Sequence, residues 1–356
     1  MMMDGPDALS AALRAVSFTL LLNAAGIPIF LAAFGRLTPR SLPDVRKLGW
    51  SLAISAMVFV AAHQALEAAR MAGEMNGVLD PAMQKMALES RAGAAFAARM
   101  VGLALVAIGL RRYGAPTHAP PHAGRAAEPS AVTLPSNAQR LDPATVANAT
   151  GSANAAGPAN ATGSANAPGS ANAARPANVS RSTMAALLGT LLTIISFTLQ
   201  GHTTTTPHRA AAAALVLLHL LVVAFWLGAL WPLYMAAKKE PPAIAARVID
   251  RFSSTATWLV PLILLAGIGL TAILLPSLDT FRHAYGQLLL VKLAGFAVLM
   301  AMASLNKWSF GPACAAGNTA AFERTVIVEF ILITVVLTAT AIMTMFYSPD
   351  AGPGAA

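Results

Sequence analysis

Charged residues are scarce in this sequence. Asp, Glu, Lys and Arg make up 11% of its 356 residues, whereas hydrophobic residues make up 56%. Soluble domains usually carry about 25% charged residues, and the mean hydropathy of +0.62 is also too high for one of them. The composition indicates a helical membrane protein, because a helix satisfies its own backbone polar groups within lipid.

Features of several other functional classes are missing. Cys314 is the single cysteine, which excludes a disulfide framework and a thiolate metal cluster. The sequence has no phosphate-binding glycine loop, nucleophile elbow or zinc-protease helix, so we do not expect an enzyme. The net charge of +9 is better explained by basic loops on one side of a membrane than by nucleic-acid binding.

Long apolar segments are abundant. A membrane-spanning helix needs about 20 predominantly apolar residues, and eight segments of the sequence meet this requirement. They predict an all-α, polytopic membrane protein with eight transmembrane helices. The segments are 15–34, 48–69, 92–110, 183–201, 211–235, 255–275, 286–306 and 324–346.

Residues 115–182 differ in composition from the rest of the chain. They are rich in Ala, Asn, Gly, Pro and Ser and contain the ragged repeat GSANAAGPANATGSANAPGSANAARPAN. Such a segment has too few large apolar residues to form a core. We therefore predict a disordered linker between a three-helix membrane part (1–114) and a five-helix membrane part (183–348), which a short tail (349–356) follows.

Lys and Arg are distributed unevenly among the predicted loops. More of them lie in the linker and in the loops after the first, fifth and seventh helices than on the opposite side. Because cytoplasmic loops carry an excess of Lys and Arg, the linker is predicted to be cytoplasmic. Both chain termini are then predicted to face outward from the plasma membrane.

Histidines concentrate toward the predicted outer side. His202 ends the fourth helix and His208 lies in the short loop after it. His219 lies about 12 Å below the outer end of the fifth helix, and His63 lies about 10 Å from the outer end of the second. Ionisable residues inside a membrane are candidates for function. We predict that these four histidines bind a metal ion; the alternative for an intramembrane histidine is a hydrogen bond to a neighbouring helix.

Sulfur and carboxylate side chains accompany these histidines. Met71 and Met75 lie in the outer loop after the second helix, and Glu67 shares a helix face with His63. Thioethers favour Cu(I) and imidazole accepts Cu(I) or Cu(II), so the combination favours copper. Glu67 could orient the His63 ring; the alternative is an interfacial glutamate near a helix end, which could also pair with Arg99.

Four ordered segments resemble a known family. Gly-His ends the fourth helix, and HLLVVAFWLGALWPL, RFSSTATWLVPLILLAGIGLTAILL and YGQLLLVKLAGFAVLMAMASLNKW follow it. This order is similar to that of the copper resistance protein D family of bacterial inner-membrane proteins, over roughly residues 200–346. The first three helices are similar to the family only in number and placement.

The resemblance implies a function and further site residues. It implies a multi-pass inner-membrane protein that moves copper from the periplasm toward the cytoplasm, often beside a periplasmic copper-binding protein. His202, His219 and Trp226 correspond to the family's Gly-His and His…Trp-x-Gly. Tyr285 and Lys292 belong to its most specific pattern, so they join Glu67, Met71, Met75 and Trp226 as accessory residues.

Two other functions stay open. A haem-binding membrane electron carrier could use His63 and His219 as axial ligands, because the two histidines lie at similar depth. A copper-resistance accessory subunit could act without moving copper itself. The function we expect is copper binding and transport, with the lipid bilayer and a periplasmic copper-binding protein as partners.

Overall fold

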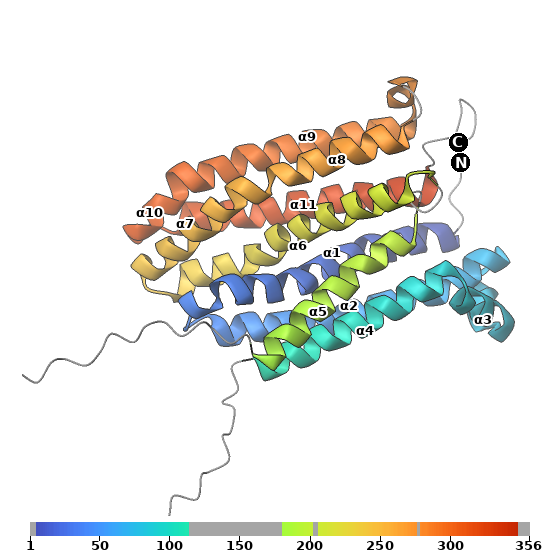
Figure 1. Ribbon diagram of the computed structural model, residues 1–356, viewed down its shortest axis with the longest axis horizontal. Coiled ribbons are helices and arrows are strands. Elements are labelled where there is room, and N and C mark those ends of the chain that lie inside the picture. The colour runs from blue at the N-terminus through green and yellow to red at the C-terminus, as the bar shows by residue number, and fades with distance from the viewer. Residues whose placement is uncertain (1–4, 114–179, 202–205, 276–277, 348–356) are drawn as a thin grey trace, which may run out of the picture. The chain divides into compact units, whose positions relative to one another are not determined.

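A computed structural model describes residues 5–113, 180–201, 206–275 and 278–347. Within these ranges all the regular structure is helical, as predicted (Figure 1). The predicted linker (115–182) lies outside the described residues up to residue 179, and so does the tail (349–356).

The α-helices run in the following order. They are α1 (Gly5–Phe34), α2 (Leu42–Ala72), α3 (Pro81–Glu89), α4 (Arg91–Arg112), α5 (Arg181–Ile195), α6 (Arg209–Lys239), α7 (Pro242–Leu259), α8 (Pro261–Leu274), α9 (Ala284–Leu305), α10 (Gly311–Ala315) and α11 (Ala320–Phe346). A π-helical turn, Asn306–Phe310, joins α9 to α10.

Eight helical stretches of the described chain are long and apolar enough to cross a membrane, which confirms the number predicted. They are Asp7–Leu37, Leu42–Ala72, Arg91–Arg112, Arg181–Leu199, Arg209–Lys239, Pro242–Leu274, Ala284–Ala315 and Ala320–Phe346. Each overlaps one predicted apolar segment. Most are longer than the prediction, because polar and charged residues at their ends continue the helix beyond the apolar run.

The sixth stretch is divided at a proline. α7 ends at Leu259 and α8 begins at Pro261, because proline has no N–H with which to continue the i→i−4 hydrogen-bond ladder. Sequence analysis gave one continuous segment here. It also missed α3, whose start is stabilised by Asp80, a side chain that accepts hydrogen bonds from the N–H groups of Ala82 (2.8 Å) and Met83 (3.4 Å).

α1 occupies the centre of the bundle. It contacts α2, α4, α5, α6 and α11, and its span is the most buried of the eight. Figure 1 shows α6 and α11 on one side of it and α2, α4 and α5 on the other. Gly26 of α1 meets Gly228 of α6, and a Cβ atom on either glycine would overlap the backbone of the other helix. Small residues at a membrane helix interface permit this close approach.

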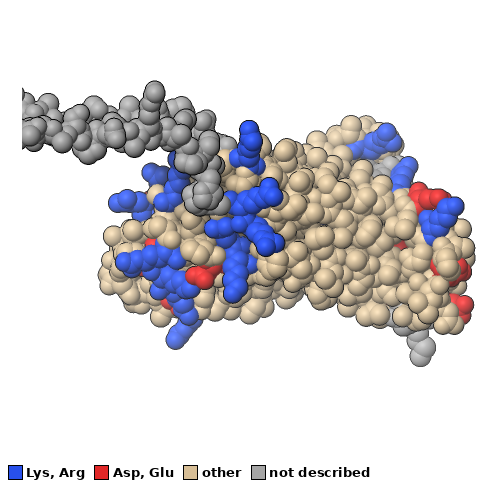
Figure 2. Space-filling view, turned by 90° about the horizontal axis from the view of Figure 1, so that it is seen from below, with Lys and Arg blue, Asp and Glu red and all other residues tan. Residues whose placement is uncertain are grey.

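Lys and Arg gather at one end of the bundle, which we call the basic end (Figure 2). It contains the ends of α1, α4, α6 and α9 and the beginnings of α2, α5, α7 and α11. Its helix ends are joined by polar contacts: Glu240 accepts hydrogen bonds from the N–H (2.8 Å) and Oγ (3.0 Å) of Ser41. Lys239 pairs with Asp44 at 2.7 Å. We call the opposite end, where α1 and α6 begin, the outer end, after the orientation predicted from the sequence.

Candidate functional site

His219 of α6 is held by a backbone carbonyl. Its Nδ1 lies 3.1 Å from the carbonyl oxygen of Ile263 in α8. Because a carbonyl oxygen only accepts hydrogen bonds, Nδ1 carries the proton and Nε2 keeps a lone pair in the neutral ring. Metal-binding histidines in proteins are commonly oriented in this way, with the second ring nitrogen donating to a carbonyl or carboxylate.

The His219 ring lines a cavity of about 750 Å³. Helices α1, α4, α6, α8, α9 and α11 all contribute to its wall, and apolar side chains make up most of the lining. The predicted residues Trp226, Tyr285 and Lys292 also line it. The fold therefore brings together His219 and three of the accessory residues. We call this space the outer cavity.

Two arginines that sequence analysis did not assign to the site line the outer cavity with Lys292. They are Arg14 of α1 and Arg99 of α4. Arg99 is buried and donates to Ser196 Oγ and to Gln200 Oε1, each at 3.1 Å, and its guanidinium stacks on the Phe197 ring. It is therefore not paired with Glu67.

His63 is buried on α2 at a different place. It is not among the residues that line the outer cavity, and its Nε2 has no hydrogen-bond partner. Three positively charged side chains, Arg14, Arg99 and Arg70, are close enough to interact electrostatically with its ring. His63 therefore does not contribute to the lining of the cavity that contains His219.

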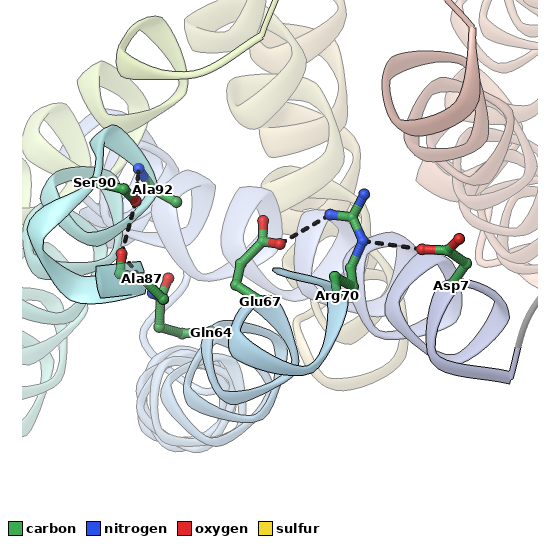
Figure 3. Close-up of polar contacts among 7 residues, drawn as sticks. All are labelled: Asp7, Gln64, Glu67, Arg70, Ala87, Ser90 and Ala92. Atoms are coloured by element: carbon green, nitrogen blue, oxygen red, sulfur yellow. Dashed lines mark hydrogen bonds and ion pairs between the residues drawn. The ribbon is translucent and has the colours of Figure 1, made fainter. Parts of the chain in front are cut away.

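Glu67 takes part in an ion-pair network at the outer end of α2 (Figure 3). Arg70 donates to Glu67 Oε2 at 2.9 Å and to Asp7 Oδ1 at 3.1 Å, so it joins α2 to α1. No hydrogen bond connects Glu67 with His63 in the described chain. Glu67 therefore anchors a helix end. These contacts fit the alternative hypothesis, an interfacial glutamate near a helix end, better than a role in orienting the His63 ring.

The remaining predicted ligands lie at the surface or outside the described residues. His208 is exposed just before α6, and Met71 and Met75 are each 47% exposed. His202 lies outside the described ranges. No group of three or more His, Cys, Asp and Glu side chains that could hold a metal ion occurs among the described residues.

A second cavity, of about 210 Å³, lies on the other side of Trp226. We call it the inner cavity, because Asn306 and Lys307 near the basic end contribute to its lining. Trp226 lines both cavities. Since Trp226 follows His219 by two turns of α6, the indole lies about 10 Å closer to the basic end.

A buried carboxylate adjoins the indole. Glu329 of α11 is 3% exposed, and its two oxygens accept from Trp226 Nε1 (3.3 Å) and Asn306 Nδ2 (2.7 Å). The Thr325 hydroxyl donates to Asn306 Oδ1 at 2.5 Å. Asn306 begins the π-helical turn, and such turns are frequent at functional sites. Glu329 lies within the predicted apolar segment 324–346, but the sequence alone could not supply its partners.

Comparison with known proteins places the chain in a family. Residues 246–343 match the family model described as Copper resistance protein D, and residues 2–134 match the model described as Copper resistance protein D-like, N-terminal domain. The two matches together cover more than half of the chain. The chain belongs to the copper resistance protein D family. No curated protein and no solved structure matches it.

Membership of the copper resistance protein D family supports a role in copper resistance or homeostasis. With eight apolar helices, it also indicates a multi-pass membrane protein. Both matched regions contribute to the outer cavity: Arg14 and Arg99 belong to the N-terminal match, whereas Tyr285 and Lys292 belong to the other. The N-terminal match extends the likeness beyond the segments from which the family was recognised in the sequence.

Proposed function

We propose that the protein binds copper at its outer end and moves it toward the basic end. The observation that carries this proposal is the pair of cavities along α6, which meet at Trp226. A conducting protein needs binding positions along a path and a barrier between them. The outer cavity offers the Nε2 lone pair of His219, and the inner cavity offers the Glu329 carboxylate behind the indole.

The cavity linings contain further copper ligands. Met343 lines the outer cavity and Met300 lines the inner one. Thioether sulfur is a soft ligand that favours Cu(I), and imidazole accepts either oxidation state. Together with His219, these side chains form a sequence of weak positions suited to passage rather than to permanent retention of the ion.

The direction of movement follows from the proposed orientation. The basic end is assigned to the cytoplasm, because cytoplasmic loops carry an excess of Lys and Arg. Both chain termini and the outer end then face the periplasm of a bacterial inner membrane. His208, which is exposed beside α6, is proposed to receive copper from a periplasmic copper-binding protein, with His202, Met71 and Met75 as further outer ligands.

Haem is a weaker candidate for the occupant of this site. The alternative requires His63 and His219 to reach one haem, and only His219 lines the outer cavity. His63 keeps its place in the copper proposal as a buried imidazole with an unpartnered Nε2. No contact of the described chain favours a bis-histidine haem over copper.

Copper binding by the purified protein tests the ligand assignment. The wild type, His219→Ala and His283→Ala are compared in competition with a Cu(I) chelator, and an absorption spectrum is recorded for each. His283 is the matched control, because it lies before α9 and does not line the outer cavity. Loss of one ligand should weaken binding by at least about tenfold in His219→Ala only. Equal affinities, or a Soret band in the wild type, would contradict the proposal.

A further inference from the structure

The outer cavity carries positive charge without a counter-charge in its lining. Arg14, Arg99 and Lys292 line it, and neither Asp nor Glu occurs among its described lining residues. Charged side chains inside a membrane are costly unless they are paired or reach water. The outer cavity is therefore a positively charged space within the membrane-spanning part of the protein.

Two of these cations have hydrogen-bond donors that no described residue accepts. Arg99 has hydrogen bonds to Ser196 and Gln200. In the part of the chain that the structure describes, neither Arg14 nor Lys292 forms a hydrogen bond or an ion pair. Arg14 lies over the Phe18 ring, with 5.5 Å between its Cζ and the ring centroid. A guanidinium has five N–H donors and an ammonium has three, so much of their hydrogen-bonding capacity is unused.

The carboxylates at the outer ends of α1 and α2 are already engaged. Glu67 acts electrostatically on Arg14, but it is bound to Arg70, which also holds Asp7. Neither carboxylate lines the outer cavity. The charge of Arg14 is therefore only partly balanced by the network at the outer end.

The three cations lie at similar positions along their helices. Arg14, Arg99 and Lys292 each lie eight or nine residues from the outer end of their helix, which corresponds to about 12 to 14 Å. Deeper in the cavity most of the lining is apolar and includes Phe296 and Leu299. This arrangement suits a ligand with an anionic group above a hydrocarbon body.

The cavity also opens toward the lipid-facing surface. Leu264 and Ile268 of α8 and Leu290 and Leu293 of α9 line it, and the same four side chains are between 39% and 57% exposed. The spans that contain α8 and α9 are the least buried of the eight. A membrane lipid can therefore reach the cavity from the bilayer without crossing water.

We propose that the outer cavity binds a phospholipid with an anionic head group. Its anionic head group lies at the end of the cavity that Arg14, Arg99 and Lys292 line, and its acyl chains lie against the apolar wall and leave between α8 and α9. Charge-assisted hydrogen bonds to phosphate oxygens satisfy the unpaired donors. The bound anion also lowers the positive potential around His219. The inference stands independently of copper movement, and its test contains no copper.

Native mass spectrometry of the full-length protein tests this proposal. Delipidated protein in detergent is incubated with equal amounts of phosphatidylglycerol and phosphatidylcholine, and the bound lipids are counted. The test variant is Arg14→Gln with Lys292→Gln. The matched control is Arg209→Gln with Arg282→Gln, which removes the same charge from two exposed arginines at the outer end. Thermal unfolding and gel filtration of each variant establish that it is folded.

The wild type and the control pair should retain phosphatidylglycerol in preference to phosphatidylcholine. In the variant with Arg14→Gln and Lys292→Gln, this preference should fall by a factor of at least about ten, because hydrogen bonds to charged groups are lost. Equal binding of both lipids by the wild type would overturn the proposal, as would equal losses in the two variant pairs. A retained porphyrin, recognised by its mass and Soret band, would assign the cavity to haem instead.

Discussion

Glu329 shows how single residues stabilise the inner half of the bundle. Its carboxylate lies between two donors, Trp226 of α6 and Asn306 after α9. A buried polar group without a partner in the membrane costs free energy, so the three side chains depend on one another. Removal of the carboxylate affects three helices at once.

Replacement of Glu329 by alanine should therefore destabilise the protein. The indole N–H and the Asn306 amide would both lose their acceptor, which lowers the free energy of unfolding by about 2 to 3 kcal/mol. Thermal or denaturant unfolding in detergent measures the change. Glu89→Ala is the control, because Glu89 makes a 3.9 Å contact with Lys85 at the exposed outer end and should change stability by less than about 0.5 kcal/mol. Equal effects of the two substitutions would show that the Glu329 network contributes little.

The packing of α1 against α6 is a property of whole helices. Gly26 and Gly228 allow the two backbones to touch, and this contact brings Arg14 and His219 into the lining of one cavity. Without a hydrophobic driving force between helices in lipid, close backbone packing supplies much of the association energy. The α1–α6 contact therefore positions the site as well as the fold.

Gly228→Ala should separate these two helices. The added methyl group would overlap the Gly26 backbone, and overpacking of this kind costs about 1 to 3 kcal/mol. The matched control is Gly267→Ala on α8, where a Cβ atom would meet nothing within 4 Å. Unfolding in detergent should show a loss of stability for Gly228→Ala and none for Gly267→Ala. A control as unstable as the test variant would mean that any glycine substitution in this bundle is harmful.

Apolar runs predicted the elements well because the membrane imposes a minimum length on each span. The sequence could not indicate the break between Leu259 and Pro261 with equal clarity, since prolines such as Pro28 and Pro232 lie inside unbroken helices. The contacts among the site residues were harder still to predict. Trp226 and Glu329 are 103 residues apart, and only the tertiary fold shows that Arg14 and Arg99 share a cavity with His219.

The charge distribution of the whole molecule supports the proposed orientation. Figure 2 shows Lys and Arg gathered at the basic end, whereas acidic side chains are present at both ends of the bundle. The excess of positive charge is expected to remain in the cytoplasm during insertion. If so, the outer cavity faces the periplasmic half of the membrane.

Cysteine labelling of intact cells tests this orientation. In a Cys314→Ser background, which removes the single native thiol, Lys85→Cys marks the outer end and Arg247→Cys marks the basic end. A membrane-impermeant maleimide that crosses the outer membrane should label Lys85→Cys in intact cells. It should label Arg247→Cys only after the inner membrane is broken. Labelling in the reverse pattern would invert the proposed direction of copper movement.

Copper accumulation in cells tests the central claim most directly. Cell-associated copper is measured for the wild type, His219→Ala, His283→Ala and empty vector at matched membrane levels of protein. We predict that the wild type and His283→Ala accumulate more copper than the vector, whereas His219→Ala falls to the vector level. Equal accumulation in all four strains, or full accumulation by His219→Ala, would contradict inward passage of copper through the outer cavity.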